Sequence, residues 1–269
     1  MWMNYQKQTA RAVSEALGNN MKVIYEPKGR AKEYAELACN LYVGCTHGCK
    51  YCYAPGVLRK TRFQWEHEGV APRKDMARDL EKDLMEMCAK QDQREVLFSF
   101  VSDPFCCAEK DYRLTRRAIT LCGAYNINHT VLTKGDYNLV SEYFDDMKKW
   151  GTRLGVSLCY VNDKSRYNWE PLASTVKERM QILKEAHQKG IKTWCSLEPV
   201  IYTKQALDLI DMMHPYVDFW KVGKLNHFKE IEDTIDWERF LYDVTETLEY
   251  HCCNYYIKND LQKFGSIMK

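Results

Sequence analysis

The sequence lacks any long apolar run: no stretch approaches the roughly 18 residues that a membrane-spanning helix needs. Its first residues also lack the apolar core and cleavage site of a secretory signal, so we expect a cytoplasmic protein without a membrane partner. Lys and Arg (39) barely outnumber Asp and Glu (37), which excludes a strong overall positive field that would attract nucleic acid. There is no internal repeat and no low-complexity segment.

Among the 12 cysteines, three lie close together in the run NLYVGCTHGCKYCYAP, which spans residues 40–55. Cys45, Cys49 and Cys52 have the spacing C-x3-C-x2-C, so their thiolates can surround a small metal site. A four-iron cluster normally takes four cysteines. With three, one iron keeps an open position at which chemistry can take place.

Two other uses of these cysteines have to be weighed. A closed zinc site needs four N or S ligands; His47 is the available fourth ligand, but it follows Cys45 so closely that both would crowd one face of the metal. A disulfide network is not expected in a protein that is not exported, because the cytosol is reducing. Clustered cysteines there more often hold metal. The other cysteines contain no second C-x2-C pair, so an auxiliary cluster is not expected.

Short runs rich in Val, Ile, Phe and Tyr alternate with amphipathic runs of helical period. The predicted strands are residues 38–43, 96–101, 129–133, 153–158, 192–197 and 217–222, and a short seventh strand is expected at 254–258. Helices are predicted at residues 73–90, 111–125, 139–150, 175–189, 204–214 and 237–250. Strict alternation favours a parallel sheet with helices outside it. Six units are too few for a complete eight-stranded barrel.

The cysteine spacing after a predicted strand resembles that of the radical S-adenosylmethionine (SAM) superfamily. The flanking tyrosines and the motif Gly-Cys-x-His-Gly-Cys resemble its spore-photoproduct-lyase-like (DNA repair photolyase-like) branch. This resemblance implies a partial (β/α)6 TIM-like barrel, open at one side for substrate. Periodicity alone equally allows a doubly wound open sheet. The cysteine loop after the first strand favours the barrel, because active groups in parallel α/β folds gather at strand C-termini. Residues 36–258 would form this core, with an N-terminal extension at 1–35 and a tail at 259–269.

The resemblance also implies two cofactors, a 4Fe–4S cluster and SAM. In the superfamily, the cluster reductively cleaves SAM to a 5′-deoxyadenosyl radical, which takes a hydrogen atom from a substrate. An electron donor such as flavodoxin or ferredoxin is therefore implied as a partner. The cofactors carry the difficult step, while the protein positions them and excludes competing reactions.

Residues at the ends of successive strands match family elements that hold SAM. Ser102 and Asp103 match a Ser/Thr-Asp-Pro element, in which the serine would bind the methionine amino group of SAM with help from the aspartate. Lys134 resembles a lysine that contacts the SAM carboxylate, and Ser157 matches a serine near the ribose. Taken separately, Ser102 and Asp103 are equally suited to capping the next helix, and Lys134 to being a solvated lysine.

The later strand ends give further candidates. Glu198 ends the fifth strand and is predicted to point into the cavity among the cofactor-binding residues. The segment after the sixth strand supplies the candidate substrate contacts Lys221, Lys224 and Asn226. Two lysines there favour an anionic ligand, and a salt bridge to Glu198 is the alternative.

The tyrosines beside Cys52 are the candidates for catalysis. In the resembling lyases, tyrosines at the positions of Tyr51 and Tyr53 line the SAM site or relay a hydrogen atom. Aromatic packing under the cluster is the alternative for at least one of them. Glu170 and Arg179 are expected to form a structural pair.

One departure limits the resemblance. The true lyases carry a hydrogen-donating cysteine two residues before the strand-two serine, where this sequence has Phe100. Thymine-dimer repair is therefore not expected. A nucleic acid or nucleotide is the favoured substrate, because of the basic stretches at residues 58–62 and 72–74 and the lysines after the sixth strand. A peptide or a small metabolite is the next candidate substrate. The rival from another class is a non-catalytic iron–sulfur or zinc-binding protein.

Overall fold

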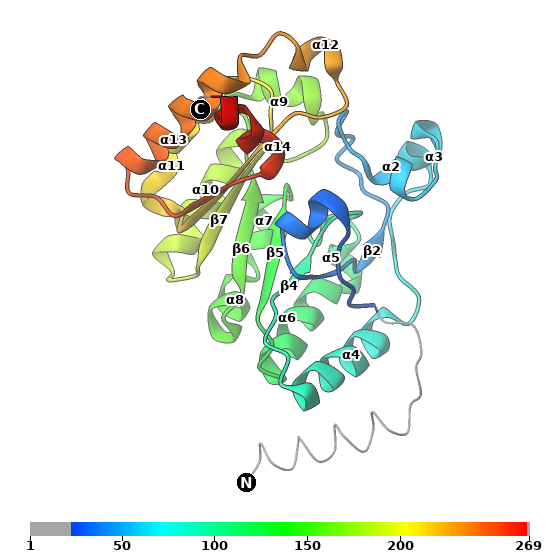
Figure 1. The fold of residues 1–269 in the computed structure, drawn as a ribbon. Helices are drawn as coiled ribbons and strands as arrows, with labels where there is room; N and C mark the ends of the chain where they lie inside the picture. Colours follow the sequence, from blue (N-terminus) through cyan, green and yellow to red (C-terminus); the bar gives the residue numbers. More distant parts are fainter. Residues whose placement is uncertain (1–22, 268–269) are drawn as a thin grey trace.

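A curved sheet of seven parallel strands forms a half-barrel in the computed structural model, which describes residues 23–267. The strands follow one another in space in chain order (Figure 1). They are β1 (Leu37–Cys39), β4 (Val96–Phe98), β5 (His129–Thr133), β6 (Arg153–Ser157), β7 (Thr193–Val200), β8 (Phe219–Lys224) and β9 (Tyr255–Ile257). A doubly wound sheet would reverse its strand order at a switch point. The predicted partial barrel is thus confirmed, including the short seventh strand.

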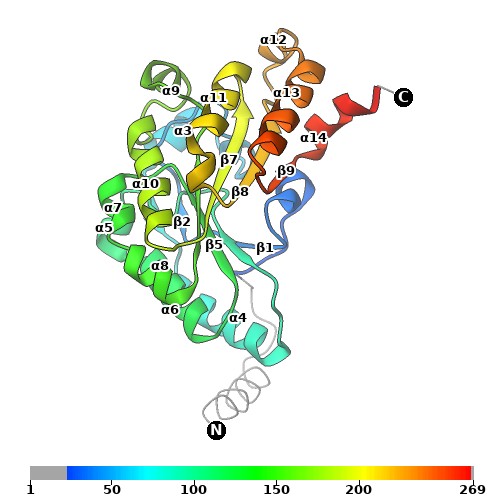
Figure 2. The ribbon, with the colours of Figure 1, turned by 90° about the vertical axis from the view of Figure 1, so that its left-hand side faces the viewer.

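Helices cover the outer face of the sheet (Figure 2). The longer ones are α4 (Met76–Lys90), α6 (Leu114–Ala124), α10 (Val176–Gln188), α11 (Thr203–Met213) and α13 (Trp237–Tyr250). Short ones are α5 (Glu109–Tyr112), α7 (Tyr137–Ser141), α8 (Phe144–Trp150), α9 (Asp163–Trp169), α12 (Lys229–Glu232) and η2 (His214–Tyr216). Thr175 and Glu178 form a capping box at the start of α10. In residues 23–267 no helix has the length and apolarity to cross a membrane.

The first predicted strand is divided in two. β1 ends at Cys39, and Tyr42–Val43 forms β2, which pairs antiparallel with β3 (Ala71–Pro72). At the break, the Asn40 side chain accepts a hydrogen bond from the backbone N–H of Val101 (2.8 Å), in the loop that follows β4. Gly44 has a φ of +90°, and a Cβ there would lie 2.1 Å from the Gly69 carbonyl oxygen. This pairing closes the base of the loop that carries the three cysteines.

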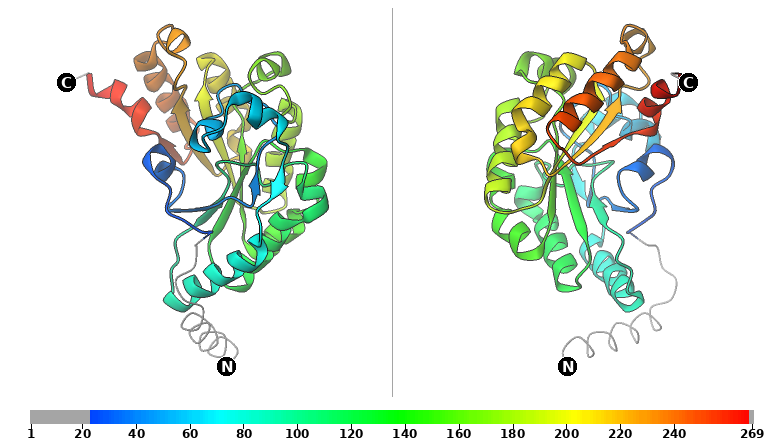
Figure 3. Two further views of the ribbon diagram at one scale, coloured as in Figure 1. Left: turned by 90° about the vertical axis from the view of Figure 1, so that its right-hand side faces the viewer. Right: turned by 60° about the vertical axis from the view of Figure 1, so that its left-hand side comes forward.

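A segment that precedes β1 crosses the open side of the half-barrel. This strap, residues 24–36, includes η1 (Gly29–Glu33) and lies between the edge strands β1 and β9 (Figure 3). Tyr25 pairs with Ala38, and the Glu33 carboxylate accepts hydrogen bonds from Tyr256 (3.0 Å) and the Asn259 backbone (2.7 Å). The first 22 residues of the expected N-terminal extension lie outside the described residues. In the expected tail, α14 (Asn259–Gln262) and η3 (Lys263–Ile267) pack against α13, with Leu261 buried.

The floor of the half-barrel requires a glycine. The buried indole of Trp194 on β7 lies over Gly155 on β6, so that an added Cβ would be 2.2 Å from the ring. The indole N–H donates to Thr130 Oγ1 (2.8 Å), which ties β7 to β5 across β6. The ring cannot move away without losing this bond.

We therefore expect Gly155→Ala to lower the free energy of unfolding by about 1–3 kcal/mol, the usual cost of overpacking a core. Urea denaturation of the two proteins measures this difference. Gly56→Ala is the matched control, because Gly56 lies in a short helix and a Cβ added there would meet no neighbouring atom within 4 Å. Equal stability of Gly155→Ala and the parent would contradict the packing described here.

Candidate active site

A cavity of about 710 Å³ lies at the C-terminal ends of the parallel strands. Loops that follow successive strands supply its walls, as expected for a parallel α/β fold. Most of the predicted site residues line it: Cys45, Cys49, Tyr51, Cys52, Tyr53, Ser102, Asp103, Lys134, Ser157, Glu198, Lys224 and Asn226. Residues far apart in sequence thus meet in one place.

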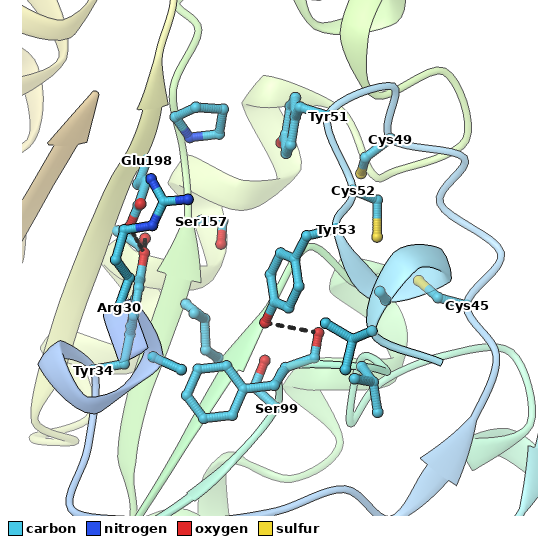
Figure 4. A pocket seen from close by; sticks show the side chains of 18 of the residues that line it. Arg30, Tyr34, Cys45, Cys49, Tyr51, Cys52, Tyr53, Ser99, Ser157 and Glu198 are labelled. Carbon is cyan, nitrogen blue, oxygen red and sulfur yellow. Dashed lines mark hydrogen bonds between the residues drawn. The ribbon is translucent and has the colours of Figure 1, made fainter. Parts of the chain in front are cut away.

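The three cysteines lie along one wall of this cavity (Figure 4). All are free thiols, and Cys49 is buried while Cys45 and Cys52 are half-buried. The backbone amide of His47 is directed at the Cys45 sulfur, a contact of the kind that tunes iron–sulfur clusters. Within residues 23–267 no three His, Cys, Asp or Glu side chains converge closely enough to enclose a single ion. Three free thiols in one cavity lining would be suited to hold a metal cluster through their thiolates.

His47, the available fourth ligand of a closed zinc site, contacts Asp103 through one of its two ring nitrogens. Its Nε2 lies 2.9 Å from the Asp103 carboxylate, and its Nδ1 is buried without a partner. The Nε2 atom of the ring is therefore engaged by Asp103, while the ring lines the same cavity as the cysteines.

The Asp103 carboxylate, in the cavity lining, accepts hydrogen bonds from several residues. Besides His47, its carboxylate accepts bonds from the Thr133 hydroxyl (2.6 Å) and from the backbone N–H groups of Phe105 (2.8 Å) and Lys134 (2.7 Å). Burial alone would raise the pKa of Asp103, but these donors outweigh it and lower the pKa. Asp103 therefore positions the cysteine loop and the end of β5. Ser102, also buried, is beside it in the lining.

Lys134 belongs to a second buried charge network. Glu170 and Arg179 are fully buried and pair at 2.6 Å, as expected, and Tyr51 donates its hydroxyl hydrogen to Glu170. Burial lowers the pKa of Lys134, but Cys49 and Glu170 outweigh it and raise the pKa to about 12. Lys134 thus brings a positive charge to the cavity, and its ammonium lies 5.7 Å from the centre of the Tyr51 ring. Arg179 also donates to the Ser157 carbonyl (2.9 Å).

Tyr53 stands in the middle of the cavity, between the cysteines and the opposite wall (Figure 4). Its side chain is 49% exposed, and its hydroxyl lies 3.4 Å from the Phe100 carbonyl oxygen. Phe100 has a φ of +95°, a strained conformation for a bulky residue. The strained turn carries the Phe100 carbonyl toward Tyr53 at the position where the lyases have their cysteine.

The opposite wall contains residues that the sequence did not indicate. The Glu198 carboxylate accepts hydrogen bonds from Tyr34 of the strap and from Lys258 (2.8 and 3.0 Å), which follows β9. Tyr34 also bonds to Ser196 (2.9 Å). Burial raises the pKa of Tyr34, and the nearby Glu198 adds to this effect. The strand-end rule could have found Lys258; no local signal marks Tyr34.

Of the three predicted substrate contacts, two line the cavity and one does not. Lys224 and Asn226 line the cavity, but Lys224 pairs with Glu232 and Asn226 donates to Asp260 (2.8 Å). Lys221 is not in the lining: its ammonium donates to the carbonyls of Glu33 and Tyr34. Because it holds the strap, Lys221 is taken out of the set of substrate contacts. The alternative salt bridge from these lysines to Glu198 is not formed either, since Lys258 takes that place.

A family model described as the radical SAM superfamily matches residues 39–214. The chain belongs to the radical SAM superfamily. Members of this family use a 4Fe–4S cluster and SAM. The three free cysteine thiols fit the cluster, and the positive charge of Lys134 fits the carboxylate of SAM.

The chain is 28% identical over 203 residues to an uncharacterized protein of Methanocaldococcus jannaschii, covering 71% of each. It is 24% identical over 191 residues to an uncharacterized protein of Acidianus two-tailed virus, covering 66% of this chain and 61% of the relative. Among solved structures, a spore photoproduct lyase variant with bound AdoMet and dinucleoside spore photoproduct matches with a TM-score of 0.66 at 15% identity, covering 86% and 78% of the two chains. A radical SAM methyltransferase from Sphaerobacter thermophilus matches with a TM-score of 0.56 at 16% identity, covering 82% and 65%. These two structures share the fold.

The strap contact of Lys221 predicts a pH dependence of stability. Burial and the positive charge of Arg153 lower the pKa of Lys221 from 10.5 to about 8. Between these values the unfolded chain binds this proton and the native protein does not, so stability rises with pH. We expect the free energy of unfolding of the parent protein to rise relative to that of Lys221→Met between about pH 8 and 10. Urea denaturation over this range measures the difference, and a constant difference would contradict the assignment.

Proposed function

We propose that this protein is a radical SAM enzyme of lyase or transferase type, in which Cys45, Cys49 and Cys52 hold a site-open 4Fe–4S cluster. The observation that carries the proposal is the convergence of the cysteine wall and the strand-end polar residues on one cavity. Its volume of about 710 Å³ is in the range of small-molecule sites. This arrangement leaves room for SAM beside the cysteines and for a substrate toward Glu198.

The cluster and SAM, when bound, supply a 5′-deoxyadenosyl radical that abstracts hydrogen from the substrate. The chain's own residues position SAM. The Lys134 ammonium pairs with the SAM carboxylate, as a point charge suits, Ser102 accepts from the amino group, and Ser157 contacts the ribose. Asp103 acts through its neighbours, because its oxygens are already bonded to His47 and the end of β5. Glu198 was predicted among the cofactor-binding residues; because it is bonded to Tyr34 and Lys258 on the wall opposite the cysteines, we now place it and Tyr34 on the substrate side.

Tyr53 and Tyr51 have different roles in this proposal. Tyr53 is accessible within the cavity and stands between the two walls, where it can pass a hydrogen atom between substrate and cofactor. The Tyr51 hydroxyl is bound to buried Glu170, so Tyr51 lines the SAM site and supports Lys134.

A nucleic acid or nucleotide is the favoured substrate, with a peptide or small metabolite next. Cationic and imidazole side chains contribute to the cavity lining near the strap: Lys28, Arg30, Lys224 and His227. Arg30 bonds to His227 (2.9 Å) and lies 3.6 Å from Asp260, which places a partly exposed guanidinium at this edge. Such a rim suits a phosphate or carboxylate group. Thymine-dimer repair is not proposed, because Phe100 replaces the lyases' donor cysteine.

The test of this function is product formation after anaerobic reconstitution with iron and sulfide. With SAM and dithionite we expect 5′-deoxyadenosine, detected by chromatography, from the parent protein and none from the Cys45/Cys49/Cys52 triple alanine variant. Iron analysis should show that the variant binds no cluster. A colourless, air-stable protein that contains zinc, or a stable cluster without 5′-deoxyadenosine under any substrate condition, would instead support a non-catalytic metal protein.

The role of Lys134 gives a separate prediction. Lys134→Ala removes a charged hydrogen bond worth about 1.5–3 kcal/mol, so SAM should bind about 10- to 100-fold more weakly. The cluster absorbance should remain. Anaerobic calorimetric titration with SAM measures the affinity, and Lys192→Ala, an exposed lysine before β7, is the control. Unchanged affinity in Lys134→Ala would remove this residue from the SAM site.

A further inference from the structure

A small cap covers the outer side of the cysteine loop. It contains α2 (Ala54–Val57) and α3 (Arg62–His67), which stand apart from the main sheet and its helices (Figure 1). Ala54 and Trp65 of the cap form a satellite core with Val101, and Cys45 and Cys52 pack against this core. The cluster cysteines are therefore approached from two sides, from the cavity and through the cap.

The cap concentrates positive charge. Residues 46–74 contain six lysines and arginines but two glutamates, a surplus of four positive charges, whereas the whole chain has a surplus of two. The remainder of the chain is thus slightly acidic. Lys50, Arg59 and Lys74 are exposed, and Lys60 and Arg62 are partly exposed. Such a local field raises the association rate of an oppositely charged partner.

Arg62 connects this surface to a cluster cysteine. Its guanidinium donates to the backbone carbonyls of Cys49 (2.8 Å) and Lys50 (2.5 Å). The Arg62 side chain is 37% exposed. A molecule that touches Arg62 is therefore one hydrogen bond away from the peptide group of a cysteine that the cluster requires.

Large apolar side chains lie exposed around the same loop. Phe63, next to Arg62, is 69% exposed and stacks on His67. Leu172 is 70% exposed, and its backbone N–H bonds to the His47 carbonyl (3.1 Å) inside the cysteine loop. A loop that only faces solvent would gain nothing from exposing such large apolar side chains. Exposed apolar groups with a charged rim mark protein interaction sites.

These residues lie outside the cavity. None of Lys50, Arg59, Lys60, Arg62, Phe63 and Leu172, which we call the cap surface, belongs to the cavity lining. SAM and substrate have to occupy the cavity, and a protein is too large to enter it. A protein that delivers electrons must therefore approach from outside, and the cap surface is the basic face over the cysteines.

We propose that the cap surface is the docking site of an acidic one-electron carrier protein, an inference that rests on the proposed radical SAM function. The reduced carrier loses one electron to the enzyme in each encounter and transfers no atom. Its acidic face pairs with Lys50 and Arg59, since Lys60 already pairs with Glu68, while Phe63 and Leu172 fill the centre of the contact. Transient redox complexes are small, which matches a surface of about six side chains.

The first test measures binding of an acidic flavodoxin to the anaerobically reconstituted enzyme by calorimetry at several salt concentrations. In Lys50→Glu/Arg59→Glu we expect the Kd to rise at least 10-fold and its salt dependence to become weaker. Arg59→Glu alone, which leaves the cysteine motif untouched, should give a smaller rise in the same direction. The control Lys148→Glu/Lys192→Glu reverses two exposed lysines at the opposite, N-terminal end of the strands and should leave the Kd unchanged.

The second test compares two reductants in the formation of 5′-deoxyadenosine. In Arg59→Glu, which leaves the cysteine motif unchanged, activity driven by limiting reduced flavodoxin should fall about 3-fold or more, while activity driven by dithionite and the iron content stay at the parent level. Dithionite is a small ion and needs no docking surface.

Three results would overturn the proposal. They are an unchanged flavodoxin Kd in both charge-reversal variants, an equal loss of activity with both reductants, or weaker binding of a DNA duplex with flavodoxin binding intact. The last would assign the cap surface to nucleic acid. If the parent enzyme makes no 5′-deoxyadenosine with dithionite, the proposed function fails, and the binding experiment still tests the docking site by itself.

Discussion

The site depends on the hydrogen bonds that the buried carboxylate of Asp103 accepts. A charge removed from water needs compensating hydrogen bonds, and Asp103 obtains them from the cysteine loop, through His47, and from the end of β5, through Thr133 and Lys134. Satisfying this one charge brings together two segments that would otherwise be independent loops. The geometry of the cysteine wall relative to Lys134 follows from it.

A second constraint is the fully buried pair of Glu170 and Arg179. Buried ion pairs contribute little net stability, because the cost of desolvation offsets the attraction. This pair instead fixes positions: Glu170 accepts the Tyr51 hydroxyl, and Arg179 binds carbonyls in the loop after α9 and at the end of β6. Cys49 and Glu170 together raise the pKa of Lys134 despite its burial. The cavity therefore has a cationic group on a rigid support beside the cysteines.

The strap gives the half-barrel its second wall. An open sheet leaves two edges, and here residues 24–36 cross between them, held by Lys221, Glu198 and the residues after β9. The cavity thus has the cysteines on one wall and Glu198 with Tyr34 on the opposite wall. The basic cap lies behind the first wall, so that substrate entry and electron entry use different faces in the proposed enzyme.

The convergence of the three cysteines with residues at the ends of β4, β5 and β6, and the half-barrel itself, could be predicted from the sequence. They depend on local spacing and on the rule that parallel strands end at one edge of the sheet. The division of the first predicted strand was missed because β2 pairs with β3, nearly 30 residues away.

The partners of Glu198, the role of Lys221 and the whole contribution of Tyr34 were decided by the tertiary structure. Tyr34 and Ser196 are 162 positions apart in the chain, and Lys221 and Tyr34 are 187 apart. No local pattern encodes such contacts, because they form only when the sheet has curved far enough to bring its two edges near the strap. The sequence alone determined the types and spacing of the candidate metal ligands, since both are local properties. Only the folded chain decided which residues form the cavity wall opposite the cysteines, because these residues come from distant parts of the sequence.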